Sequence, residues 1–143
     1  MDAIELKLCD IQGRLFESFA DCQYDSESLV KSFMTSDLAK DLDSEYNRMQ
    51  WAGEEYLLEE LLATCKEKLT VKVEDVSKEA LFWMGYIYRY WHFYTGEESS
   101  KIYKQAPFDT MNTNYLMFHT LDSEMAIENL KEIYRQKVQG KKR

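Results

Sequence analysis

The sequence predicts an all-α protein, a single domain over residues 1–143 built as a bundle of about six to eight helices around a central aromatic-rich helix. One proline and five glycines leave few positions that would interrupt a helix. The hydrophobic share of 45% and the aromatic share of 14% are sufficient for a hydrophobic core. In most segments the apolar residues recur at steps of three and four, which is the period of an amphipathic helix.

The first helix is predicted over residues 3–22, because one face carries Ile4, Leu8, Ile11, Leu15, Phe19 and Cys22. Gly13 lies in the middle of this segment and would let another helix approach closely. Asp25 or Ser26 is expected to cap a second helix. Ser36 and Asp37 are expected to begin another helical turn or two, either as a separate short helix or as one that merges with the segment that follows.

A long helix is predicted over residues 44–68 because a broad stripe recurs at helical spacing: Tyr46, Met49, Gly53, Tyr56, Leu57, Leu61 and Cys65. The opposite face is expected to be solvated, since it carries Glu54, Glu55, Glu59, Glu60 and Glu67. In residues 69–74 the pattern changes to strict alternation, which indicates a short extended segment. Without an evident strand partner, we interpret it as a connector.

The central helix is expected to begin after a capping Ser77 and to end at Gly96, a residue that readily adopts the left-handed conformation found at helix ends. Apolar residues cover nearly every side of this segment, as in a helix at the centre of a bundle. A short helix is predicted over residues 97–106, and Pro107 would stop it.

Two helices are expected at the carboxyl end of the chain. The first is predicted over residues 108–118. Thr120 or Asp122 is expected to cap the last helix, whose apolar positions again step by three and four: Ile127, Leu130, Tyr134 and Val138. A short basic tail is expected at about residues 140–143.

Composition and charge narrow the classes of partner. The formal net charge of −8 would repel nucleic acid everywhere except at the basic tail, which disfavours a DNA-binding regulator. The most apolar stretch, residues 80–93, is interrupted by Arg89 and His92 and is too short to span a bilayer. The acidic start of the chain does not resemble a signal peptide, so we expect a cytoplasmic protein with no membrane partner. Its three cysteines are expected to be reduced, buried and unpaired.

None of the strongest chemical motifs is present. The chain lacks H-E-x-x-H and paired C-x-x-C, so we expect no metal, and it lacks G-x-S-x-G, the P-loop and G-x-G-x-x-G, so we expect no cofactor and assign no catalytic residue. Arg89 and His92 lie three positions apart on the central helix. We interpret His92 as a core histidine bonded to a carbonyl and Arg89 as a rim residue that Glu97 or Glu98 could pair with.

Unusual residues are densest between residues 86 and 119, where six tyrosines, Trp91 and both histidines alternate with apolar positions. Tyr and Trp join a large apolar area to a polar tip, which suits either the rim of a core or a protein-recognition surface. The predicted partner-binding residues are Arg89, Trp91, His92, Tyr94, Tyr103 and His119. The alternative is a small enzyme or nucleotide-binding protein with a polar pocket formed by Arg89, His92, Asn112 and His119.

Five segments resemble a family of small uncharacterised bacterial proteins: residues 10–13 (DIQG), 49–53 (MQWAG), 86–97 (YIYRYWHFYTGE), 102–104 (IYK) and 115–122 (YLMFHTLD). The genes of that family lie beside genes for ADP-ribosyltransferase-like toxins. The resemblance therefore implies an antitoxin or accessory protein that neutralises its neighbour by direct binding, and it implies no catalytic residue.

Overall fold

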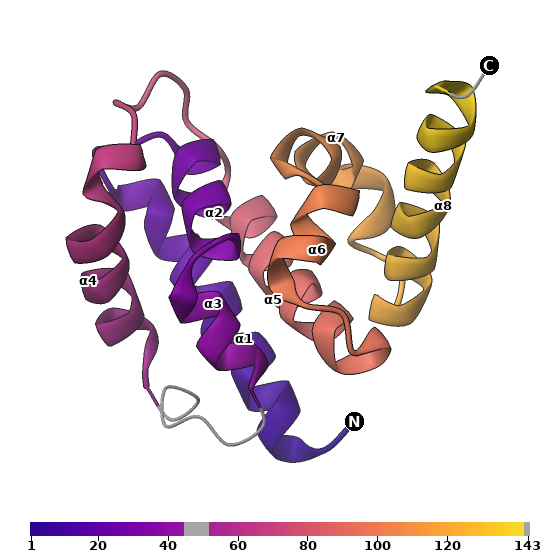
Figure 1. Ribbon diagram of the computed structural model, residues 1–143, viewed down its shortest axis with the longest axis horizontal. Coiled ribbons are helices and arrows are strands. Elements are labelled where there is room, and N and C mark those ends of the chain that lie inside the picture. Colours follow the sequence, from indigo (N-terminus) through magenta and orange to yellow (C-terminus); the bar gives the residue numbers. More distant parts are fainter. Residues whose placement is uncertain (45–51, 142–143) are drawn as a thin grey trace.

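Eight α-helices and two short 3-10 turns form one all-α domain in the computed structural model, which describes residues 1–44 and 52–141, and no strand occurs in these two ranges (Figure 1). The fold class predicted from the sequence is therefore confirmed. The elements are α1 Ala3–Ser18, η1 Phe19–Asp21, α2 Ser26–Met34, α3 Asp37–Asp43, α4 Glu54–Cys65, η3 Lys66–Lys68, α5 Lys78–Thr95, α6 Ser99–Gln105, α7 Phe108–Phe118 and α8 Ser123–Lys141.

Helix α1 begins with a capping box. The Asp2 side chain accepts a hydrogen bond from the Glu5 amide (2.8 Å), and the Glu5 carboxylate accepts one from the Asp2 amide (3.2 Å). The α-helix ends at Ser18 and continues as η1, short of the predicted end at Cys22. Ser18 Oγ donates to the Leu15 carbonyl (2.5 Å), and such a local bond competes with the helical hydrogen bonds.

The predicted long helix over residues 44–68 is shorter in the structure. Helix α4 begins at Glu54 with Gly53 as its extended N-cap, so Gly53 does not belong to the apolar stripe. Tyr56 is 47% exposed and also lies outside that stripe, whereas Leu57, Leu61 and Cys65 are buried as expected. The predicted stripe members Tyr46 and Met49 lie outside the described residues. Among the glutamates, Glu55, Glu59 and Glu67 are exposed, and Glu54 and Glu60 are half-buried.

The connector over residues 69–74 is extended, and it finds a partner that the sequence did not indicate. It runs antiparallel to the loop after η1 through an isolated bridge between Tyr24 and Val71. The Asp25 amide donates to the Thr70 carbonyl (2.7 Å), and the Lys72 amide donates to the Gln23 carbonyl (3.0 Å). A stretch of only three residues on each side is too short for a sheet, so the segment remains a connector.

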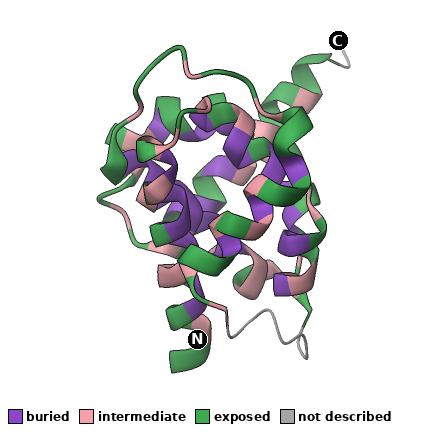
Figure 2. Ribbon diagram, turned by 90° about the vertical axis from the view of Figure 1, so that its left-hand side faces the viewer, coloured by how far each residue is buried: buried purple, intermediate pink, exposed green. Residues whose placement is uncertain are grey.

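Helix α5 lies between two groups of helices, α1–α4 on one side and α6–α8 on the other (Figure 1). The Ser77 hydroxyl caps it by accepting from the Ala80 amide (3.1 Å), and Gly96 ends it with φ of 79°. Both boundaries confirm the sequence prediction. Its inward residues belong to a core to which each of the other seven described helices also contributes, and the buried segments line the inside of the bundle (Figure 2). The largest fully buried apolar side chains are Phe16, Phe19, Phe33, Tyr88 and Trp91.

Helices α1 and α5 pack closely along most of their length, and two glycines make this possible. A Cβ atom at Gly13 would lie 2.8 Å from the Phe82 ring, which confirms the close approach predicted at Gly13. A Cβ atom at Gly85 would lie 2.4 Å from the backbone oxygen of Gln12. The Gln12 side-chain amide also donates to the Gly85 carbonyl (3.1 Å), so the two helices are joined at the crossing.

The carboxyl-terminal helices follow the predicted boundaries closely. Pro107 is the N-cap of α7, and the Asp122 side chain accepts from the Met125 amide (3.0 Å) at the start of α8. Helix α8 continues to Lys141, so it includes the first part of the predicted basic tail, and residues 142–143 lie outside the described residues. No helix in the described part of the chain is long and apolar enough to cross a membrane.

Candidate functional site

Four aromatic residues form a ladder along the outer side of α5: Phe82, Tyr86, Tyr90 and Tyr94. Residues four apart lie on the same side of a helix, and the ring centroids are 6.1 Å apart for Phe82 and Tyr86 and 6.3 Å apart for Tyr86 and Tyr90. The first three side chains are half-buried, and Tyr94 is 41% exposed. The innermost helix of the bundle therefore keeps one aromatic side open to solvent.

The amino-terminal half of this ladder borders a hollow of about 290 Å³ between α5, α7 and the start of α8. Tyr115 on α7 and His119, the C-cap of that helix, stack with ring centroids 4.4 Å apart and line the hollow. The Tyr115 ring also meets Trp83 edge to face at 5.8 Å, which holds the end of α7 against α5. Exposed apolar side chains also occur on the two helices that border the hollow, Leu116 (79%) on α7 and Met125 (53%) on α8.

The carboxyl-terminal half of the ladder is bordered by carboxylates from α8. The Tyr90 hydroxyl lies 3.4 Å from Glu124 Oε1, and the Tyr94 hydroxyl lies 3.2 Å from Glu128 Oε1. Burial and the nearby Glu124 carboxylate raise the pKa of Tyr90, and the hydrogen bond to Glu128 raises the pKa of Tyr94. Both hydroxyls therefore remain protonated donors at neutral pH.

We call this surface the ladder face, and its central part contains both rings and carboxylates. On the side of α1, burial raises the pKa of Tyr86, and Cys9 and Asp10 add smaller contributions in the same direction. Arg14 pairs with Asp10 at 2.9 Å. The ladder face comprises Phe82, Tyr86, Tyr90, Tyr94, Tyr115 and His119 with the carboxylates of Asp10, Glu124 and Glu128.

Arg89 lies in the interior, so the prediction that it contacts a partner is wrong. Its guanidinium donates to Asp43 Oδ1 (2.6 Å), Gln12 Oε1 (2.8 Å) and Ser99 Oγ (3.3 Å). The predicted position at the rim and the predicted pairing with Glu97 or its neighbour are also wrong, because Asp43 on α3 is the counter-ion. Burial lowers the pKa of Arg89, and Asp43 opposes that shift. This network joins α1, α3, α5 and α6.

Trp91 and Tyr103 are also buried, so neither can be the surface anchor that the sequence predicted. Trp91 Nε1 donates to Glu97 Oε1 (3.0 Å), and Lys131 Nζ donates to the same oxygen (2.7 Å). Burial raises the pKa of Glu97, but hydrogen bonds from Lys131, Trp91, Gln105 and Thr95 outweigh it and bring the value to about 2. This carboxylate connects α5, α6 and α8.

The two histidines occupy separate places. His92 Nδ1 lies 2.7 Å from the Glu97 carbonyl, which confirms the predicted histidine–carbonyl bond. His92 lines a hollow of about 560 Å³ with Asp43 and the first turns of α1, and that hollow shares no lining residue with the one at His119. Asn112 is exposed on α7 and lines neither hollow. The alternative pocket of Arg89, His92, Asn112 and His119 is therefore not assembled.

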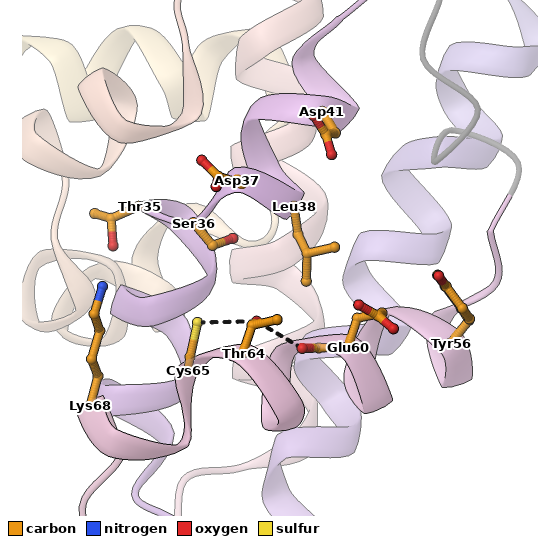
Figure 3. Close-up of a pocket in the computed structure, with 10 residues that line it drawn as sticks. All are labelled: Thr35, Ser36, Asp37, Leu38, Asp41, Tyr56, Glu60, Thr64, Cys65 and Lys68. Carbon is orange, nitrogen blue, oxygen red and sulfur yellow. Dashed lines mark hydrogen bonds between the residues drawn. The ribbon is translucent and has the colours of Figure 1, made fainter.

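Another hollow, of about 420 Å³, lies between α3 and α4 (Figure 3). It is lined by three carboxylates, Asp37, Asp41 and Glu60, and by Lys68. Figure 3 shows the short contacts from Thr64 to the Glu60 carbonyl (2.8 Å) and to Cys65 Sγ (3.7 Å), which stay within α4. In the part of the chain that the structure describes, no three His, Cys, Asp or Glu side chains are arranged to hold a metal ion.

The fold and the site together define a helical protein with a candidate protein-recognition surface. Comparison with known proteins adds no relative, since no family model, curated protein or solved structure matches the chain. Of the six predicted partner-binding residues, only Tyr94 and His119 lie on the ladder face. Sequence reasoning missed Phe82, Tyr86 and Tyr90, although their four-residue spacing was a visible signal.

Proposed function

We propose that this protein is a non-catalytic binding module of the cytoplasm that docks a protein partner on the ladder face. The observation that supports this proposal is the open aromatic side of α5. Tyrosine is enriched in protein interfaces because it combines a large rigid apolar area with a polar tip. Three tyrosine rings in a row, continued by the ring of Phe82, offer a contact area that a partner could bury.

The partner that we propose is an ADP-ribosyltransferase-like toxin encoded beside this protein, which the protein neutralises by occupying its surface. The resemblance of residues 86–97 and 115–122 to proteins encoded beside such toxins supports this assignment. Both segments contribute to the ladder face, the first through Tyr86, Tyr90 and Tyr94 and the second through Tyr115 and His119. The net charge of −8 suits a partner with a basic surface.

Co-expression and binding measurements with the neighbouring toxin test the proposal. The protein is expected to rescue growth of cells that produce the toxin and to co-purify with it. Changing Tyr90 or Tyr94 to Ala is expected to weaken the complex at least about thirtyfold, the usual effect of truncating an interface anchor. Tyr56→Ala is the matched control, because Tyr56 is 47% exposed on α4, away from the ladder face. It is expected to leave binding unchanged.

Circular dichroism and urea unfolding distinguish a loss of contact from a loss of fold. All three variants are expected to keep wild-type helix content, since each removed ring is at least partly exposed. Absence of binding to the toxin by the wild-type protein would refute the proposed partner. An equal loss of affinity in Tyr56→Ala and Tyr94→Ala would refute the ladder face as the docking site.

A further inference from the structure

We infer that the ladder face recognises arginine side chains, and that its partner presents them four residues apart on a helix. This inference rests on the proposed function, because it specifies the chemistry of the partner that docks there. The guanidinium group is the one protein cation that both stacks on an aromatic ring and forms two parallel hydrogen bonds with a carboxylate.

Two ring–carboxylate pairs on the ladder face offer this combination. Tyr90 lies beside Glu124, and Tyr94 lies beside Glu128. Each pair joins an aromatic side chain of α5 to a carboxylate of α8. A guanidinium placed over the ring can therefore reach the neighbouring carboxylate without leaving the ring face.

The spacing of the pairs sets the spacing of the ligands. Tyr90 and Tyr94 are four residues apart on α5, and Glu124 and Glu128 are four residues apart on α8. The two pairs therefore repeat at about one helical turn, roughly 5–6 Å. Two arginines four residues apart on a partner helix have the same repeat, so one helix can occupy both pairs.

The carboxylates are available for an incoming cation. Both glutamates are exposed, and neither has an ion-pair partner among residues 1–44 and 52–141. Glu132, farther along the same helix, pairs instead with Arg135 at 2.9 Å. The tyrosine hydroxyls hold the two carboxylates at 3.4 and 3.2 Å, longer than a typical O–H···O hydrogen bond. A charge-assisted guanidinium contact can replace these long bonds.

The charges on the ladder face also disfavour ligands other than arginine. The two α8 carboxylates, which have no ion-pair partner in the described part of the chain, would repel the phosphates of a nucleic acid. A purely apolar partner segment would bury Glu124 and Glu128 without a counter-ion, which is costly. A lysine can pair with the carboxylate, but its ammonium lacks the planar fork that stacks and binds in two places.

Two alanine-rich helical peptides test the inference, one with two arginines four residues apart and the other with lysines at the same positions. Fluorescence anisotropy of the labelled peptides gives both affinities at low salt. The arginine peptide is expected to bind about tenfold more tightly, and Glu124→Gln with Glu128→Gln is expected to remove that preference. The control is Glu55→Gln with Glu59→Gln, which removes the same charge from an exposed side of α4. It is expected to keep the preference.

Equal binding of the two peptides, or an equal loss in both double variants, would overturn the inference, because either result means attraction by net charge alone. The toxin complex separates this inference from the proposed function. If the toxin binds and depends on Tyr94 but not on Glu124 and Glu128, the arginine inference fails and the docking face stands. If the toxin does not bind while the arginine peptide binds through these glutamates, the proposed partner fails and the arginine chemistry stands.

Discussion

The crossing of α1 and α5 predicts that Gly85→Ala is strongly destabilising. The added Cβ atom would lie 2.4 Å from the Gln12 backbone oxygen and 2.9 Å from the Phe16 ring. A backbone oxygen cannot rotate away as a side chain can. To move from 2.4 Å to ordinary contact at 3.4 Å, the two helices must separate by about 1 Å at this point.

Three contributions determine how much Gly85→Ala lowers the free energy of unfolding. Forcing an extra methyl group into a packed interface costs about 1–3 kcal/mol and sometimes more. Separating the helices also strains the 3.1 Å hydrogen bond from Gln12 to the Gly85 carbonyl, which contributes about 1 kcal/mol. The higher helix propensity of Ala offsets about 1 kcal/mol of this loss. The net expectation is a loss of about 1–3 kcal/mol, or a fall in Tm of roughly 3–10 °C for a chain of this size.

Gly13→Ala on the opposite helix is the matched control. The three atoms nearest to its Cβ atom would all belong to the ring of Phe82, a half-buried side chain that can turn outward more easily than a backbone can move. The gain in helix propensity offsets this adjustment, so we expect a stability within about 1 kcal/mol of wild type. Urea unfolding followed by circular dichroism measures both variants. Equal destabilisation by the two substitutions, or wild-type stability of Gly85→Ala, would refute the claim that the backbones of α1 and α5 need this contact.

Three further predictions concern the interior. Asp43→Ala should cost about 3–5 kcal/mol in urea unfolding because it leaves Arg89 buried without a counter-ion, and a cost below about 1 kcal/mol would contradict this. Hydrogen bonds hold the pKa of Glu97 at about 2, below the ordinary glutamate value of 4.5, so its stabilisation is present above pH 4.5 and is lost as the pH falls toward 2. Glu97→Gln should therefore be less stable than wild type at pH 7 by about 1–3 kcal/mol, with the difference shrinking toward pH 2. Half-buried Cys22 should react first with a thiol reagent, since Cys9 and Cys65 are buried; burial raises the pKa of Cys22 as well, but that of Cys9 rises to about 12, and equal rates would contradict this.

Local signals in the sequence were sufficient to predict most of the helix boundaries. Ser77, Gly96 and Pro107 act through their own backbone and nearest neighbours, so each marked a boundary correctly. The start of α4 was missed because Gly53 fits both a helix interior and an N-cap, and periodicity alone does not distinguish them. The end of α1 was missed because a serine hydrogen bond, rather than a break in the apolar pattern, accompanies it.

The site was harder to predict because it depends on which side of α5 the other helices cover. Periodicity showed that nearly every side of this helix is apolar, and this property does not reveal which side remains open. Arg89 and Trp91 looked like interface residues because they are polar-tipped and large. The counter-ion of Arg89, Asp43, is 46 positions away in the sequence, and Lys131, whose Nζ lies 5.6 Å from the centre of the Trp91 ring, is 40 positions from Trp91, so only the folded chain brings them together.

The buried network and the ladder face are consequences of the same rotation of α5 about its axis. Arg89 must point toward Asp43, and Gly85 must face Gln12, because any other rotation would leave a charge unpaired or a backbone clash. With these two residues fixed, the four-residue spacing places the ladder positions on the remaining side. The interior contacts thus determine that Tyr90 and Tyr94 face outward beside α8. Variants that loosen the Arg89 network should therefore weaken the docking proposed for the ladder face, even though none of the residues in this network lies on that face.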